Sequence, residues 1–238
     1  MLFVIVSFLV SMLAARAHRA LFGDRRPKVG VQHRTEQLRD LWTRSREPLR
    51  NHVRAEEHHG PHLPLDVDLV CPTGIARGAG QALPEKILVL PVIAYGYTGH
   101  VMDFPGTINQ HFEHFIHHVL DITKSLAYHG FKKIILLNGH GSNMPNLDLV
   151  ARRTNLETDA ECCVVAWWNL LTVDKAFLPR WRQSRFPGGC SHACELETSL
   201  YLYLDGDNVR KDLIKNVKSQ KWNWPALSPN YLKRKRAL

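Results

Sequence analysis

Three apolar runs, separated by segments with helical periodicity, constrain the fold of this chain more than any other feature. The runs are KILVLPVIAYG at 86–96, IILL at 134–137 and CCVVAW at 162–167. Consecutive apolar residues are typical of strands that are buried on both faces of a sheet. Between the first two runs, apolar residues at helical spacing predict an amphipathic helix over 109–129. Because strands and helices alternate, we expect a three-layer α/β/α fold with a mostly parallel sheet.

Further helices extend this pattern. We expect a short helix over 71–83 and another that follows residue 143 and ends near 156. A last helix is predicted by the apolar stripe Leu196, Leu200, Tyr203 and Leu204. Four histidines at helical spacing lack a carboxylate in register, so we interpret them as a solvated face of the helix over 109–129: His111, His114, His117 and His118.

The stretch EHHGPHLPLDVD at 57–68 is the densest in possible metal ligands. Its two prolines and its glycine predict an extended, bent loop. In an extended chain Glu57 and His59 lie on the same side, while Asp68, beyond the bend, can bridge two ions with its two oxygens. Carboxylates mixed with imidazoles favour Zn, Mn or Fe over Ca or Mg. The alternative is a polar surface loop that happens to be rich in histidine.

Two candidate functional positions follow predicted strands. His140 stands between two glycines directly after the strand at 134–137, and ligands of parallel α/β sheets bind at such carboxyl ends. Trp167 and Trp168 end the third strand. Paired tryptophans there either line a substrate pocket or belong to the core.

The length of 238 residues fits one domain with a sizeable core. The net charge of +9 divides into +7 for residues 1–54, −6 for 55–209 and +8 for 210–238. We therefore interpret 55–209 as the domain that carries the chemistry, between a basic N-terminal segment and a basic C-terminal tail. A nucleic-acid enzyme carries its positive charge around the site, so we expect no nucleic-acid partner.

Cysteine content and the N-terminus bear on the compartment. Five cysteines, two of them adjacent, are no disulfide framework and favour a reducing, cytoplasmic environment. The apolar run at the start of the chain is too short for a comfortable membrane span, so we expect no membrane partner. A signal peptide over 1–17 is the second interpretation, although its first residues contain no Lys or Arg.

Three motifs together resemble the creatininase family over about residues 55–205: EHHGPHLPLDVD, LNGHGSN and HACELETS, joined by YGYTGH and FPGT. The resemblance implies a compact α/β domain, assembly as a homohexamer and a pair of divalent ions, often Zn with Mn or Fe. It also implies hydrolysis of a non-peptide C–N bond, such as the amide or formamide of a small molecule. One branch of the family instead cleaves a short peptide.

The resemblance also assigns roles to single residues. It implies as metal ligands Glu57, His59, Asp68, His140 and Glu197. Asp68 matches the bridging aspartate, and His192 matches a histidine that contacts substrate and takes part in proton transfer. We expect Gly141 to contact substrate as well.

The chain departs from the family pattern at several positions. Ser142 stands where creatininase itself has a glutamate ligand, which points away from creatinine as substrate and makes Glu197 the expected fifth ligand. Cys194 replaces a usual glycine, and the charged sequence REPLRNHVRAE at 46–56 replaces an apolar strand. The alternatives to a small-molecule amidohydrolase are a peptide-processing hydrolase of the family and a catalytically inactive, scaffold-like homologue.

Overall fold

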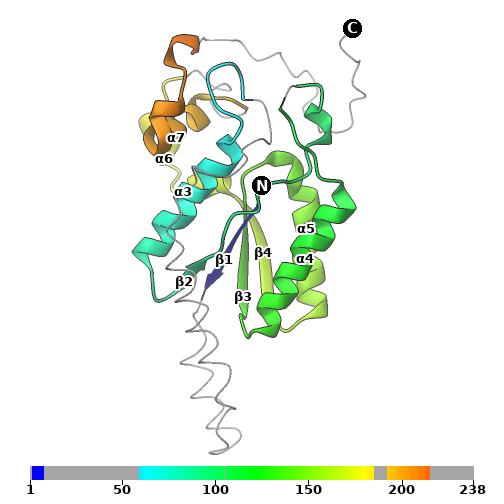
Figure 1. Ribbon diagram of the computed structural model, residues 1–238. Coiled ribbons are helices and arrows are strands. Elements are labelled where there is room, and N and C mark those ends of the chain that lie inside the picture. Colours follow the sequence, from blue (N-terminus) through cyan, green and yellow to red (C-terminus); the bar gives the residue numbers. More distant parts are fainter. Residues whose placement is uncertain (1, 8–58, 105, 185–191, 215–238) are drawn as a thin grey trace, which may run out of the picture.

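A central four-stranded sheet with helices on both faces organises the computed structural model, which describes residues 2–7, 59–104, 106–184 and 192–214 (Figure 1). The strands are β1 (Leu2–Ser7), β2 (Ile87–Val89), β3 (Lys133–Asn138) and β4 (Glu161–Ala166), in the order β2-β1-β3-β4. β3 and β4 pair in parallel, whereas β1 is antiparallel to both of its neighbours. β2, β3 and β4 therefore run in one direction, and the predicted three-layer fold with a mostly parallel sheet is confirmed.

The second and third predicted strands agree with the structure to within one residue, but the first does not. The run at 86–96 forms only the three-residue β2, which ends at Val89. Pro91 has no backbone N–H to donate to a neighbouring strand, and β2 lies at the edge of the sheet, where a nearby proline is tolerated. The prediction of one long buried strand is therefore wrong in its length.

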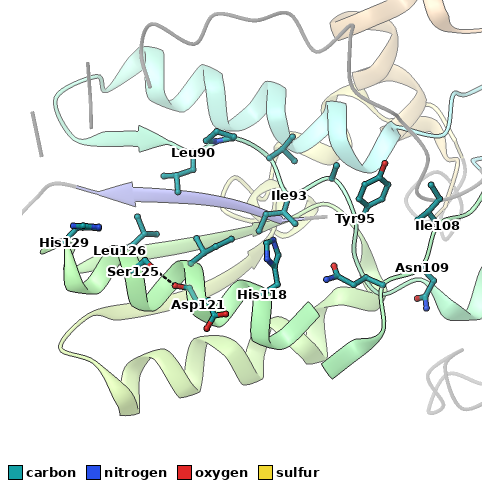
Figure 2. Close-up of a pocket in the computed structure, with 15 residues that line it drawn as sticks. Leu90, Ile93, Tyr95, Ile108, Asn109, His118, Asp121, Ser125, Leu126 and His129 are labelled. Carbon is teal, nitrogen blue, oxygen red and sulfur yellow. Dashed lines mark hydrogen bonds between the residues drawn. The ribbon is translucent and has the colours of Figure 1, made fainter. Parts of the chain in front are cut away.

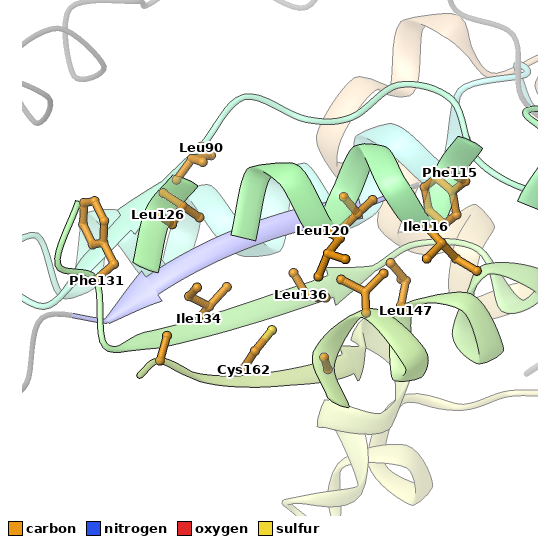
Figure 3. Packing of buried hydrophobic residues seen from close by; sticks show 14 of the residues in the cluster. Leu90, Phe115, Ile116, Leu120, Leu126, Phe131, Ile134, Leu136, Leu147 and Cys162 are labelled. Carbon is orange, nitrogen blue, oxygen red and sulfur yellow. The ribbon is translucent and has the colours of Figure 1, made fainter. Parts of the chain in front are cut away.

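Two helices, α4 (Phe112–Tyr128) and α5 (Met144–Glu157), cover one face of the sheet. Alternate residues of β3, Ile134 and Leu136, point to this face and pack with Phe115 and Leu147 (Figure 3). His111, which caps the start of α4, and the three histidines within the helix are all exposed, which confirms the predicted solvated face.

The other face is covered by α3 (Val67–Ala82) and α7 (Glu195–Asp205), with the short α6 (Phe177–Trp181) nearby (Figure 1). Leu137 of β3 packs there with Cys71 and the fully buried Tyr201. α3 begins four residues before the predicted start at 71. The first helical turn needs no internal N–H donors, so the prolines before it do not prevent the helix from including Val67 and Asp68. The predicted loop over 57–68 is wrong at this end.

Short 3₁₀ segments complete the described chain: η2 (Gly99–Val101), η3 (Gly141–Asn143), η4 (Trp167–Thr172), η5 (Gly206–Asn208) and η6 (Lys211–Leu213). Val209 is buried, and Arg210 N donates to His62 O at 3.0 Å, so the chain stays attached to the domain beyond α7. Among the described helices, none is long and apolar enough to cross a bilayer. The division of the chain at residues 54 and 209 remains a prediction.

A cavity of about 950 Å³ lies between α4 and the segment that follows β2 (Figure 2). Its lining is mainly apolar and includes Leu90, Ile93, Tyr95 and Leu126, with His118 at the α4 side. None of the candidate metal ligands lines this cavity.

Candidate metal centre

Side chains from four separate parts of the chain meet next to the carboxyl end of β3. His140 follows β3 directly, and Asp68 lies in the first turn of α3. His59 precedes α3, and Glu197 lies in the first turn of α7. These four predicted ligands are all buried. The fifth, Glu57, lies outside the residues that the structure describes.

Asp68 lies at the centre of this cluster. Its Oδ1 is 3.3 Å from His59 Nε2, and its Oδ2 is 3.0 Å from His140 Nδ1. One carboxylate thus contacts two imidazoles through two different oxygens. Each oxygen of Asp68 therefore has a different histidine beside it.

The surroundings of Asp68 favour its charged form. Burial acts to raise its pKa, but the nearby charge of His59 and hydrogen bonds from His140 and His59 outweigh this effect. The pKa of Asp68 therefore lies well below its ordinary value. A carboxylate must be deprotonated to bind a cation, so Asp68 is prepared for that role.

Glu197 approaches the same group from α7. Its Oε1 lies 3.9 Å from His59 Nε2, and its Oε2 accepts a hydrogen bond from Cys194 N at 3.3 Å. Burial raises the pKa of Glu197 to about 7, with the negative charge of Asp68 adding to the effect and His59 opposing it. A cation beside these two carboxylates would relieve their mutual repulsion.

His192 lies against His59 at the exposed side of the cluster. The two ring centroids are 4.3 Å apart, with the planes inclined by 40°. Ligand atoms of His59, His192 and Glu197 all lie within 4.8 Å of one another, so this trio has the spacing of a metal site. His192 is exposed, whereas the other two are buried. It is therefore in a position to exchange protons with solvent beside a possible ion.

Backbone geometry explains why a glycine precedes His140. A Cβ placed on Gly139 would stand 2.1 Å from the backbone oxygen of Asp68, which no real side chain allows. The loop after β3 can therefore lie against α3 only with glycine at this position. Asn138 fixes the next residue, because its Nδ2 donates to His140 O at 2.6 Å and its Oδ1 accepts from His140 N at 3.2 Å.

His100 is a neighbour of the cluster to which the sequence analysis gave no role. Its ring stacks on that of His140 with a centroid distance of 5.7 Å, and Ser142 Oγ lies 3.1 Å from its Nδ1. The signal was present in the motif YGYTGH, which ends at His100. Spacing alone could not find it, because 40 positions separate it from His140.

Of the three predicted substrate contacts, the two tryptophans pack against the protein, whereas Gly141 borders open space. Trp167 is only 2% exposed and belongs to the core beneath α3 and α7, and Trp168 packs edge-on against it at 5.9 Å. Gly141 borders open space, because a Cβ built there meets nothing within 4 Å. The assignment of all three to the substrate remains a prediction.

The donor set suits a divalent transition metal. Imidazole nitrogens and carboxylate oxygens are the mixed ligands that Zn and Mn accept in proteins. Two of the three carboxylates predicted as ligands, Asp68 and Glu197, are buried within 3.9 Å of His59, where they are costly unless a cation compensates them. Fold and site together define an α/β protein with a candidate metal centre at the carboxyl end of its sheet.

Comparison with known proteins places the chain within that class. The family model described as creatininase, creatinine amidohydrolase, matches residues 53–235. The chain belongs to the creatininase family.

Two curated relatives show the range of activities in the family. A creatinine amidohydrolase from Pseudomonas putida is 30% identical over 174 residues, which cover 68% of this chain and 66% of the relative. A mycofactocin precursor peptide peptidase from Mycobacterium tuberculosis is 32% identical over 165 residues, which cover 66% of this chain and 58% of the relative. The match thus spans 66% of the length of the first relative and 58% of the length of the second, less than two thirds of each.

Solved structures agree with this assignment. The crystal structure of a creatininase has a TM-score of 0.61 and 28% identity, with 74% of this chain and 73% of that chain covered. A structure described as "Creatininase Mn" has a TM-score of 0.60 and 28% identity, with coverage of 75% and 70%. A mutant creatininase described as the Zn–Zn type is also similar, with a TM-score of 0.59 and 26% identity over 74% and 73%.

Proposed function

We propose that this protein is a metal-dependent amidohydrolase that hydrolyses a non-peptide C–N bond, an amide or formamide, in a small molecule. Membership of the creatininase family and relatives that act on amides support the reaction class. One structural observation carries the proposal furthest. The two oxygens of the buried Asp68 face His59 and His140 at 3.3 and 3.0 Å.

The proposed site has two divalent ions, Zn with Mn or Fe. Its ligands would be Glu57, His59, Asp68, His140 and Glu197, with Asp68 shared. Bound there, the ions would supply a water of lowered pKa and polarise the amide carbonyl. The neighbouring creatininases described with Mn and with Zn support the choice of metals.

The side chains around the ions have separate tasks in this proposal. His192, exposed and 4.3 Å from the ring of His59, is suited to deliver a proton to the departing nitrogen, because imidazole titrates near neutral pH. Asp68 and Glu197 bring negative charge that holds the cations in place. Gly141 leaves room for substrate beside His140.

Hydrolysis of a short peptide is the second candidate function. The 32% identity to a mycofactocin precursor peptide peptidase favours it. Ser142 argues against creatinine as the substrate, because the family resemblance implies a glutamate ligand of creatininase itself at the matching position. Creatinine is therefore the substrate that we expect least.

A substrate panel with the metal-loaded full-length chain tests the proposal. Formamides, cyclic amides and short peptides would be assayed after reconstitution with Mn or Zn, with His192→Ala as the catalytic variant and the exposed His114→Ala on α4 as the control. The proposal requires metal-dependent hydrolysis of the C–N bond of a small amide, lost in His192→Ala and retained in His114→Ala. Turnover of peptides alone would select the second function, and metal binding without any turnover would identify an inactive homologue.

Assembly and location belong to the same proposal. We expect a homohexamer, which light scattering on the purified chain would measure. We expect a cytoplasmic location, which is supported by the free thiols of Cys71, Cys162, Cys163 and Cys194 among the described residues. Fractionation of cells that express the tagged protein would test it.

A further inference from the structure

His100 and Ser142 form a polar pair beside the candidate metal centre. The ring of His100 stacks on the ring of His140 with planes inclined by 29°, whereas Asp68 meets the edge of His140 at Nδ1. Ser142 Oγ lies 3.1 Å from Nδ1 and 3.2 Å from Nε2 of His100. Depending on the tautomer of His100, the hydroxyl donates to one ring nitrogen or accepts from the other, and either hydrogen bond restrains the ring.

The segment that carries His100 is held tightly to the loop after β3. Tyr97 N donates to Asn143 Oδ1 at 2.8 Å, and Asn143 is fully buried. A Cβ on Gly96 would stand 2.6 Å from the Asn143 side chain, so the segment approaches this closely only because residue 96 is glycine. His100 is therefore positioned in advance rather than free to move away.

The backbone next to this pair is exposed. Gly141, between His140 and Ser142, borders open space. His100 itself is half-buried, and the turn that follows it exposes Met102 and Phe104. The pair thus combines a fixed polar group with access from the protein surface.

His100 is better placed to contact substrate than to bind metal. Its ring stacks on the ring of one proposed ligand, His140, and its nitrogens face the hydroxyl of Ser142, which is not a metal ligand in the proposed site.

We propose that His100, oriented by Ser142, binds an oxygen acceptor of the substrate, a carbonyl or a carboxylate, at a distance from the bond that is hydrolysed. The inference rests on the proposed amidohydrolase function and narrows its substrates to amides with a second oxygen group. His100 is then a specificity-determining residue, and Ser142 is a positioning residue that acts through it.

Three matched formamides test this specificity. N-Formylglycine carries a carboxylate, N-formylglycinamide carries a carbonyl, and N-isobutylformamide has an apolar group of similar shape. With the Mn-loaded wild type we expect a lower KM for one or both of the first two than for the third. If N-formylglycine has the lower KM of the first two probes, the acceptor is a carboxylate; if N-formylglycinamide has it, the acceptor is a carbonyl.

Variants then locate the contact. His100→Ala should raise KM for the preferred probe by about tenfold, as loss of one hydrogen bond predicts, with kcat within about twofold and N-isobutylformamide unaffected. Ser142→Ala should have a smaller effect that Ser142→Thr restores, and His114→Ala should have none. Equal changes for all three probes, or loss of metal from His100→Ala, would overturn the inference.

Measurement of ligand binding by calorimetry tests the role of His100 independently of whether the protein hydrolyses the probes. Absence of hydrolysis of every probe by metal-loaded protein would count against the proposed function. Calorimetric titration of N-formylglycine and N-formylglycinamide into the same protein would still decide the inference. Binding that is weakened about tenfold in His100→Ala would support it, and binding that is equal in both proteins or absent from the wild type would overturn it.

Discussion

The backbone oxygen of Asp68 occupies the space that a side chain on Gly139 would need, because a Cβ built there stands only 2.1 Å away. This contact joins the loop that carries His140 to the first turn of α3. It connects the backbone around two proposed ligands, Asp68 and His140, without depending on their side chains.

Replacement of Gly139 should therefore damage both stability and the metal site. In Gly139→Ala the new methyl group would force the loop away from α3, and overpacking of this kind costs about 1–3 kcal/mol. We expect a lower free energy of unfolding in urea and weaker metal binding in a dye-competition assay. Gly141→Ala is the matched control, because its Cβ meets nothing within 4 Å. A Gly139→Ala protein that matches Gly141→Ala in both measurements would contradict the role assigned to the contact.

Tyr201 and Asp66 connect α7 to the start of α3. Tyr201 is fully buried, and its hydroxyl donates to Asp66 Oδ1 at 2.8 Å. Tyr201→Phe removes this donor from a buried carboxylate, so we expect a loss of about 1–3 kcal/mol in the free energy of unfolding. Tyr203→Phe on the same helix is the control, because Tyr203 is 86% exposed. Thermal and urea denaturation of both variants would measure the difference, and equal stabilities would contradict the prediction.

The ion cluster of Glu157, Arg153 and Lys124 makes the free energy of unfolding depend on pH in the acid range. Glu157 accepts hydrogen bonds from Arg153 and Lys124, which lower its pKa from 4.5 to about 2. A carboxyl group whose pKa is depressed in the folded state contributes stability above its unfolded pKa. That contribution is lost as the pH falls from about 4.5 through about 2.

Glu157→Gln should therefore destabilise the protein at pH 7 and have progressively less effect as the pH falls below 4.5. Urea denaturation of both proteins over this range would measure the change. Because the group is at the surface, 1 M salt, where the screening length is about 3 Å, should reduce the difference at pH 7. A difference independent of pH would show that the ion cluster is not its cause.

The interior of the fold could be predicted from the sequence because local signals and tertiary structure agree there. Ile134 to Leu137 form the apolar centre of β3. Two lysines precede this run, and Asn138 and Gly139 follow it. The histidine-bearing face of α4 was read correctly from spacing. The strand after Lys86 was predicted too long, because the apolar residues beyond Pro91 line a cavity and do not continue the strand.

The metal centre depended on more than periodicity. No spacing rule brings together Asp68, His140 and Glu197, which are distant in sequence, and only the family resemblance connected them. The motif YGYTGH contains His100, but its spacing does not reveal that the ring stacks on His140, so the sequence analysis gave His100 no role. The central position of β1 was also not foreseen, because six apolar residues at the start of a chain fit a leader as well as a strand.

Metal content per chain tests the central claim most directly. Elemental analysis would compare the wild type with Asp68→Asn and with Asp148→Asn, an exposed residue of α5, after circular dichroism has shown that all three are folded. We predict about two ions per chain in the wild type and in Asp148→Asn, and fewer than about one in Asp68→Asn, because an amide cannot bridge two cations as a carboxylate does. Well-folded wild-type protein that binds no metal, or an Asp68→Asn protein that retains both ions, would contradict the account.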